Sequence, residues 1–175
     1  MRMLAAIVLA ITPFAVTAAE PENPYKNAKV GDTLTYKVTV KEGDVNLEST
    51  GVWTVTEKTE KQVTVKTVAT ILGKEQPAKE TKIDLTKEYA PTGKFQKHKD
   101  GTERLKFGDK EYDCTWQSYK FEPGANAPER FAVQSELKFW FSKGVPGFVK
   151  MNSSTKATNN ETNVTMELTE FKAGK

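Results

Sequence analysis

The feature that most constrains the fold is a strict alternation of apolar and polar side chains that begins at Leu34. A period of two places the apolar side chains on one face of a β-strand and the polar ones on the other. The segment therefore predicts a strand with one buried face. Its apolar face carries Leu34, Tyr36, Val38 and Val40, and its polar face carries Thr33, Thr35, Lys37 and Thr39.

The same alternation returns along the rest of the chain in short segments separated by polar turns. After the first 20 residues, no segment repeats apolar side chains at the spacing of an amphipathic helix over three turns. The strongest strand is predicted for residues 131–142, and an irregular loop is predicted for residues 122–130. Strands at such regular spacing describe an antiparallel meander. The sequence therefore predicts an all-β fold of nine or ten strands.

The first 19 residues have the features of a cleavable secretory signal peptide. Arg2 supplies a short positive region, no charge follows up to Val16, and small residues precede a cleavage position near Ala19. An uncleaved N-terminal anchor is the alternative. No later segment approaches the roughly 18 consecutive apolar residues of a membrane-spanning helix. We expect an exported, periplasmic or secreted protein with a signal peptide at 1–19 and a single β domain at 20–175.

Residues 86–102 interrupt the strand pattern. They are rich in lysine, contain two glycines and one proline, and offer only Tyr89 and Phe95 as aromatic anchors. A connection of this length without periodicity is either functional or mobile. We expect a polar, mobile connection near 86–102 within the single domain.

Charge and motif content exclude several classes of function. The chain has 26 basic and 23 acidic side chains, whereas a nucleic-acid-binding domain is usually strongly basic with clustered charge. The spacings of nucleophile-elbow, zinc-protease, P-loop and dinucleotide-binding motifs are absent. His98 is the only histidine and lies in a polar stretch, so a histidine-based triad has no support. The sequence predicts a protein that is not an enzyme, binds no nucleic acid and needs no cofactor or metal.

Cys114 is the only cysteine, so an intramolecular disulfide is impossible. It alternates with Tyr112 and Trp116, which places the three side chains on one face of a strand. Free cysteines are among the residue types most often buried. We expect Cys114 to be buried and unreactive.

Aromatic side chains are the most informative functional feature of the sequence. They occupy the dominant apolar phase of several strands, as an ordinary core would also require. On the concave face of a curved sheet, however, such side chains can leave a gap that accepts an apolar ligand. We therefore expect a small apolar molecule or a lipid to bind there. The candidate binding residues on that face are Tyr36, Val38, Trp53, Trp116, Phe139 and Phe141.

Three segments carry a resemblance to known proteins: NPYKNAKVGD at 23–32, KEYDCTW at 110–116 and FWFSKGVPGFVKM at 139–151. Together they resemble a group of small exported bacterial proteins of unknown function, which share a signal peptide, a first strand led by VGD and a VPG hairpin. More remotely, the order of the strands is similar to the lipoprotein-carrier superfamily. That resemblance implies an antiparallel sheet folded into a half-barrel that shelters acyl chains.

The strand pattern and the resemblance together predict a strongly curved antiparallel sheet, either a half-barrel or an open barrel. The predicted function is non-catalytic binding of an apolar small molecule or lipid. The competing hypothesis is a structural or protein-interaction module of the cell envelope, whose exposed strand edges would contact its partners. A narrow concave pocket lined by aromatic rings favours the first hypothesis, and a filled core with a flat exposed edge favours the second. The identity of the ligand and the oligomeric state stay open.

Overall fold

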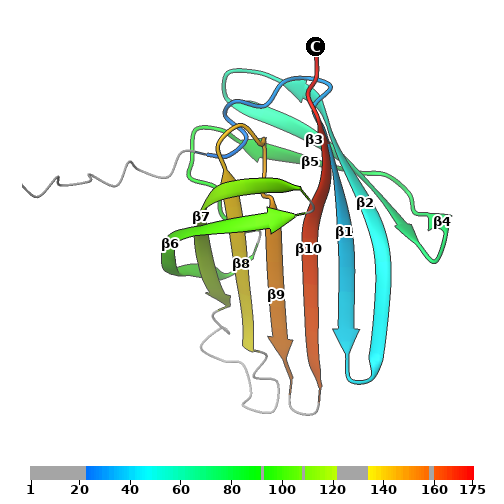
Figure 1. Ribbon diagram of the computed structural model, residues 1–175. Coiled ribbons are helices and arrows are strands. Elements are labelled where there is room, and N and C mark those ends of the chain that lie inside the picture. The colour runs from blue at the N-terminus through cyan, green and yellow to red at the C-terminus, as the bar shows by residue number, and fades with distance from the viewer. Residues whose placement is uncertain (1–22, 92, 108, 122–133, 158–159) are drawn as a thin grey trace, which may run out of the picture.

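The computed structural model describes residues 23–91, 93–107, 109–121, 134–157 and 160–175. This part of the chain contains ten strands and no helix. All ten strands belong to one antiparallel sheet, which confirms the all-β prediction (Figure 1). The predicted signal peptide at 1–19, the predicted loop at 122–130 and the first residues of the strand predicted for 131–142 lie outside the described residues.

The strands follow one another along the chain with turns or longer connections between them. The first strand covers the alternating segment that begins at Leu34. The strands are β1 (Thr33–Glu42), β2 (Val45–Lys58), β3 (Gln62–Ile71), β4 (Lys74–Glu75), β5 (Lys79–Asp84), β6 (Phe95–Phe107), β7 (Lys110–Phe121), β8 (Gln134–Ser142), β9 (Lys150–Lys156) and β10 (Glu161–Lys172).

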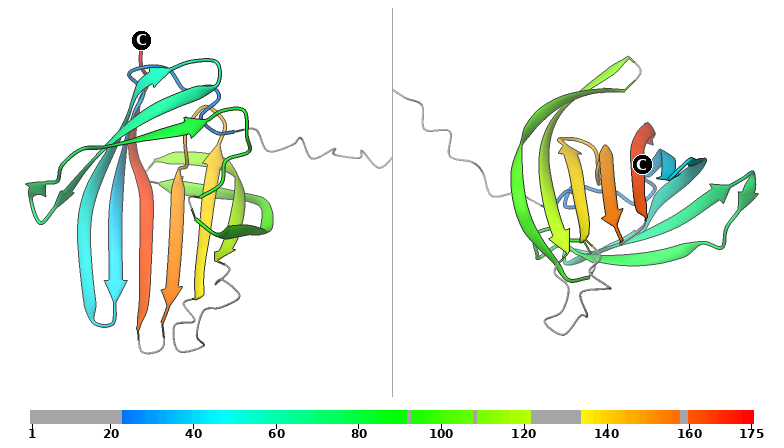
Figure 2. Two further views of the ribbon diagram at one scale, coloured as in Figure 1. Left: turned by 180° about the vertical axis from the view of Figure 1, so that it is seen from behind. Right: turned by 90° about the horizontal axis from the view of Figure 1, so that it is seen from below.

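The order of the strands brings the first and the last strand together in the middle of the sheet. This order is β4-β3-β2-β1-β10-β9-β8-β7-β6, and β5 also pairs with β3. Among the described strands, β6 ends the sheet on one side and β4 and β5 end it on the other, so the sheet does not close. Seen end-on, β6 and β7 arc around one side while β3 and β5 extend along the other (Figure 2). The structure therefore confirms a strongly curved, open antiparallel sheet.

Register places residues of neighbouring strands in rows that share one face of the sheet. We call one face the inner face, because rings from the segments between strands pack on it. The buried Tyr36 packs there against Phe148, and Phe139 packs there against Tyr89. One row of the inner face runs through Val38, Met166, Met151, Phe139 and Gln117.

The outer face is covered by the far part of the β6–β7 hairpin, which crosses in front of β8 and β9 in Figure 1. Trp140 is buried there, and its Nε1 donates a hydrogen bond of 2.8 Å to Glu103 on β6. The Lys138 ammonium lies 3.9 Å from the ring centroid of Trp116 and 4.4 Å from that of Trp140. This cation–π arrangement joins β8 to β7 on the outer face. One row of this face runs through Glu167, Lys150, Trp140, Trp116 and Gly101.

Gly101 makes the close packing of Trp116 possible. The two residues lie directly opposite each other on β6 and β7. A Cβ atom at position 101 would lie 2.8 Å from the indole ring, closer than Cβ atoms come to other heavy atoms in proteins. The ring of Trp116 therefore covers a position that only glycine can occupy without displacement.

Cys114 is buried as predicted, with 3% of its surface exposed. Burial raises the pKa of its thiol to about 11, and the carboxylates of Glu103 and Asp113 add to the rise. Because the thiolate is the reactive form, we expect native protein at neutral pH to react slowly with 5,5′-dithiobis(2-nitrobenzoate) and urea-unfolded protein to react rapidly. Native and unfolded protein reacting at the same rate would contradict this burial.

The polar connection predicted near 86–102 is shorter in the structure, because β6 already begins at Phe95. The prediction was wrong for the second half of this range. β6 lies at the edge of the sheet, and most of its side chains are exposed. An edge strand has one neighbour and needs little apolar surface, and lysines are typical of such edges. The connection that remains carries Tyr89.

Candidate functional site

Three aromatic residues outside the strands cover part of the inner face. Tyr25 precedes β1, Tyr89 lies between β5 and β6, and Phe148 lies between β8 and β9. The ring centroid of Tyr89 lies 6.0 Å from that of Tyr25 and 5.6 Å from that of Phe139. We call Tyr25, Tyr89 and Phe148 the aromatic cover. They supply apolar contacts that the strands alone do not provide.

Four of the six predicted binding residues meet beneath the aromatic cover. The ring centroid of Tyr36 lies 4.7 Å from that of Trp53 and 4.8 Å from that of Phe148. The Tyr36 hydroxyl donates a hydrogen bond of 2.8 Å to the backbone oxygen of Phe148. Tyr36 is therefore fixed in the core. The four residues are Tyr36, Trp53, Phe139 and Phe141.

Trp116 does not join this group. Register pairs Trp116 with Trp140 on the outer face, whereas Phe139, one position earlier on β8, lies on the inner face. The expectation that all six candidates share one face is therefore wrong for Trp116. Val38 lies on the inner face and is half-buried. Ligand binding by the five residues of the inner face stays a prediction.

The aromatic cover is the part of this region that the sequence pattern did not reveal. Its three residues lie outside the strands, where alternation carries no information. The available signal was an aromatic ring within a segment of polar residues, glycine and proline, as in NPYKNA around Tyr25 and VPGF before Val149. Large apolar side chains in such segments are candidates for packing over a sheet.

A pocket of about 340 Å³ remains between the aromatic cover and the strands β2, β3 and β5. We call it the aromatic pocket. Val65 and Ile83 add aliphatic surface to its lining, and Thr81 belongs to the β5 side of it. Its aromatic walls are Tyr25, Trp53, Tyr89 and Phe148.

Asn23 holds two parts of the aromatic cover in place. Its side-chain Nδ2 donates hydrogen bonds of 3.0 Å to the backbone oxygens of Asp84 and Lys87. Its Oδ1 accepts a hydrogen bond of 3.0 Å from the backbone N–H of Tyr25. The buried amide of Asn23 therefore ties the segment of Tyr25 to the connection that carries Tyr89.

Tyr89 is also held from the side of β7. The Tyr119 hydroxyl donates a hydrogen bond of 2.9 Å to the backbone oxygen of Tyr89. The neighbouring Glu88 accepts a hydrogen bond of 3.1 Å from Gln117 and pairs with Lys97 at 3.2 Å. These contacts fix the connection to both β6 and β7, so the pocket wall is preformed.

The aromatic walls of the pocket carry no charge, and the charged residues that also line it are Lys82, Lys87, Asp84 and Glu88, two of each sign. Burial raises the pKa of Tyr25, and it raises the pKa of Tyr89 to about 12. The hydroxyls of both residues therefore stay protonated near neutral pH. At the rim, Lys87 and Asp84 pair at 3.2 Å and compensate each other. Within the part of the chain that the structure describes, no three His, Cys, Asp or Glu side chains are grouped to hold a metal ion.

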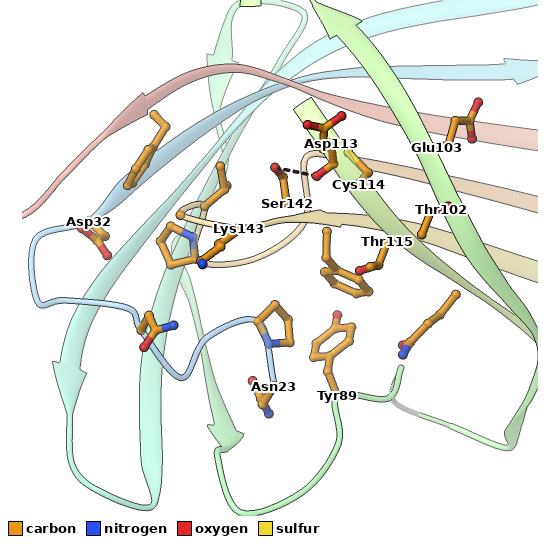
Figure 3. Close-up of a pocket in the computed structure, with 18 of the residues that line it drawn as sticks. Asn23, Asp32, Tyr89, Thr102, Glu103, Asp113, Cys114, Thr115, Ser142 and Lys143 are labelled. Atoms are coloured by element: carbon orange, nitrogen blue, oxygen red, sulfur yellow. Dashed lines mark hydrogen bonds between the residues drawn. The ribbon is translucent and has the colours of Figure 1, made fainter. Parts of the chain in front are cut away.

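A larger cleft of about 1040 Å³ lies on the other side of Tyr89 (Figure 3). Asn23, Glu88 and Tyr89 line both cavities and therefore form the wall between them. Figure 3 shows the hydroxyl of Tyr89 directed toward the side of the cleft that carries Thr115. Of the six predicted binding residues, this cleft is lined by Phe141 alone.

Comparison with protein-family models, with curated proteins and with solved structures finds no match for this chain. The resemblances based on the sequence motifs therefore stay predictions. Among the residues described, no helix has the length and apolar character needed to cross a membrane.

Proposed function

We propose that this protein, exported as residues 1–19 predict, binds a small apolar molecule in the aromatic pocket without acting on it chemically. The observation that carries the proposal is the convergence of four aromatic rings from four separate segments on one cavity of about 340 Å³. Small-molecule pockets usually measure about 300–1,000 Å³ and are lined mainly by apolar and aromatic side chains with a few polar groups. The aromatic pocket lies at the lower end of this range in volume, and polar and charged residues complete the lining that its aromatic walls begin.

The walls of the pocket are held by contacts that need no ligand. The edge-on contact of Trp53 with Tyr36 and the hydrogen bonds of Asn23 exist within the protein itself. A preformed site loses little binding free energy to the ordering of side chains. We therefore expect dissociation constants between about 1 and 100 µM, which correspond to about 8 to 5.5 kcal/mol.

Two probes of different shape test the proposal: dodecanoate, a flexible acyl chain, and 2-acetylnaphthalene, a rigid bicycle. Binding of either should change the fluorescence emission of Trp53, and the change should vanish in Trp53→Phe, because Trp116 and Trp140 lie on the outer face. At about 100 times the dissociation constant, binding should stabilise the protein by about 2.7 kcal/mol. The melting temperature should then rise by about 5–10 °C.

A matched pair of variants on β5 locates the site. Thr81 shares a face with Ile83 and lines the aromatic pocket, whereas Glu80 alternates with Thr81 and does not line it. Thr81→Phe should fill the pocket and weaken probe binding at least tenfold, and Glu80→Phe should leave it within about twofold. If neither probe changes the emission or the melting temperature at about a millimolar, which corresponds to about 4 kcal/mol, the proposal fails.

The competing hypothesis, a structural or protein-interaction module, draws on a different feature. Four apolar side chains near the ends of the β1–β2 and β3–β4 hairpins are 43–78% exposed. Register pairs Ile71 with Ser49, two positions from Leu47 on β2, and exposed apolar side chains that are close together are typical of contact surfaces. This hypothesis becomes the better supported one if neither probe binds. The four residues are Val45, Leu47, Ile71 and Leu72.

A further inference from the structure

The hydroxyl of Tyr25 has no hydrogen-bond partner within the described part of the chain, and its oxygen is accessible, since Asn152 Oδ1 is the only fully buried polar side-chain atom there without a partner. Tyr25 is 4% exposed and lines the aromatic pocket. Two other buried tyrosines differ from it. The Tyr36 hydroxyl donates to the backbone oxygen of Phe148 at 2.8 Å, and the Tyr119 hydroxyl donates to that of Tyr89 at 2.9 Å.

The Tyr25 hydroxyl lies beside Gly147, the residue that precedes Phe148 of the pocket wall. A Cβ atom at position 147 would lie 3.2 Å from the Tyr25 oxygen, which is tighter than most Cβ contacts. Gly147 also has a φ of +126°, a backbone conformation that other residues rarely adopt. Glycine at this position therefore allows the Tyr25 ring to pack closely against the backbone of the segment that carries Phe148.

The chemistry of this hydroxyl restricts the group that can satisfy it. A ligand that displaces water from this hydroxyl has to supply a hydrogen-bond acceptor, because a tyrosine hydroxyl left without a partner costs free energy. Burial raises the pKa of Tyr25, and the nearby Tyr89 adds to the rise, so the hydroxyl is a donor at neutral pH. The four aromatic walls carry no charge, and the pocket is also lined by two basic and two acidic residues, so an ionised group placed among the rings would lose its hydration without meeting a net opposite charge.

We infer that the ligand of the aromatic pocket is a flat, uncharged apolar molecule with an oxygen acceptor, such as a ketone or an ether, that receives a hydrogen bond from Tyr25. The inference rests on the proposed function and names the class of ligand. A flat ring system suits walls made of Tyr25, Trp53, Tyr89 and Phe148, because aromatic rings favour offset-stacked and edge-on contacts. The acceptor orients this ring system within an otherwise apolar site.

Two probes of nearly identical shape test the inference. 2-Acetylnaphthalene carries a C=O group where 2-isopropenylnaphthalene carries C=CH₂. Calorimetric titration gives the dissociation constant of each probe for the native protein and for Tyr25→Phe. The ketone is better solvated in water, so the relevant quantity is the change in the ratio of the two constants, as in a double-mutant cycle. Tyr25→Phe should raise the dissociation constant of the ketone about tenfold, equivalent to 1.4 kcal/mol. The dissociation constant of the alkene should change by no more than about twofold.

Tyr36→Phe is the matched control, because it removes a hydroxyl that already has a partner in Phe148. It should lower the melting temperature of the ligand-free protein and preserve the ratio of the two constants. Tyr25→Phe should leave the melting temperature of the ligand-free protein unchanged or raise it, because no hydrogen bond within the described protein is lost. A decrease as large as that of Tyr36→Phe would show that the Tyr25 hydroxyl already has a partner, and would overturn the inference.

The outcomes separate the inference from the proposed function. If both probes bind and Tyr25→Phe changes their affinities equally, or changes neither, the inference is wrong and the binding function stands. If neither naphthalene probe binds the native protein but dodecanoate does, the inference alone is wrong; if dodecanoate also fails to bind, both are wrong.

Discussion

Replacing Phe148 with alanine is expected to lower the free energy of unfolding by about 3–5 kcal/mol. Phe148 is 5% exposed, and its ring centroid lies 4.8 Å from that of Tyr36 and 5.6 Å from that of Phe139. It belongs to the connection between β8 and β9, so its removal opens a cavity between this connection and the inner face. Urea denaturation followed by circular dichroism measures the loss.

Phe121→Ala is the control for this effect. Phe121 ends β7, is only half-buried, and contacts Phe95 at a centroid distance of 5.6 Å. Phe121→Ala should lower the free energy of unfolding clearly less than Phe148→Ala does, because it removes less buried apolar surface. Phe148→Ala should also abolish binding of the probes, since Phe148 is one wall of the aromatic pocket. Equal costs for the two variants would contradict the described packing of Phe148 on the inner face.

Replacing Trp140 with alanine is the second change with a large expected effect, again about 3–5 kcal/mol. Trp140 is buried on the outer face, where its Nε1 donates to Glu103 on β6 and its ring faces the ammonium groups of Lys138 and Lys150. Its removal should detach the far part of the β6–β7 hairpin from β8. We expect hydrogen exchange to accelerate in β6 and β7 more than in β1 and β10.

Trp140→Phe separates the ring from its hydrogen bond. Phenylalanine keeps much of the apolar contact and loses the bond to Glu103, which should cost about 1 kcal/mol beyond the change in volume. If Trp140→Ala lowers the free energy of unfolding no more than Trp140→Phe does, the ring of Trp140 does not stabilise the packing of the β6–β7 hairpin on β8. Uniform acceleration of exchange across all strands would mean that the hairpin is not a separate unit of local stability.

The alternation from Leu34 to Val40 was sufficient to predict a half-buried strand, because side chains in a strand change face at every residue. The same rule does not tell which face of one strand continues which face of the next. That relation depends on register, and a shift of one residue reverses it. Trp116 and Phe139 each belong to the dominant apolar phase of their strands. Trp116 pairs with Trp140, the residue after Phe139 on β8, so Trp116 and Phe139 lie on opposite faces of the sheet.

Two other differences have similar physical causes. The sequence of the edge strand β6 predicts a polar connection because few of its side chains are buried. In the middle of the strand, only Gly101 and Leu105 are half-buried, and the other residues are exposed. The aromatic cover could not be found from periodicity, because Tyr25, Tyr89 and Phe148 lie in connections held by specific hydrogen bonds such as those of Asn23. The fold class was therefore predictable from pattern, whereas the pocket depends on contacts between segments distant in the sequence.

The location of a bound probe tests the binding proposal most directly. We expect intermolecular nuclear Overhauser effects between 2-acetylnaphthalene and the side chains of Trp53, Tyr25 and Tyr89, all of which line the aromatic pocket. The half-buried Val38 and Met151, which lie on the inner face outside this pocket, should show none. Contacts to Val38 and Met151 without contacts to Trp53 would contradict the assignment of the aromatic pocket as the binding site.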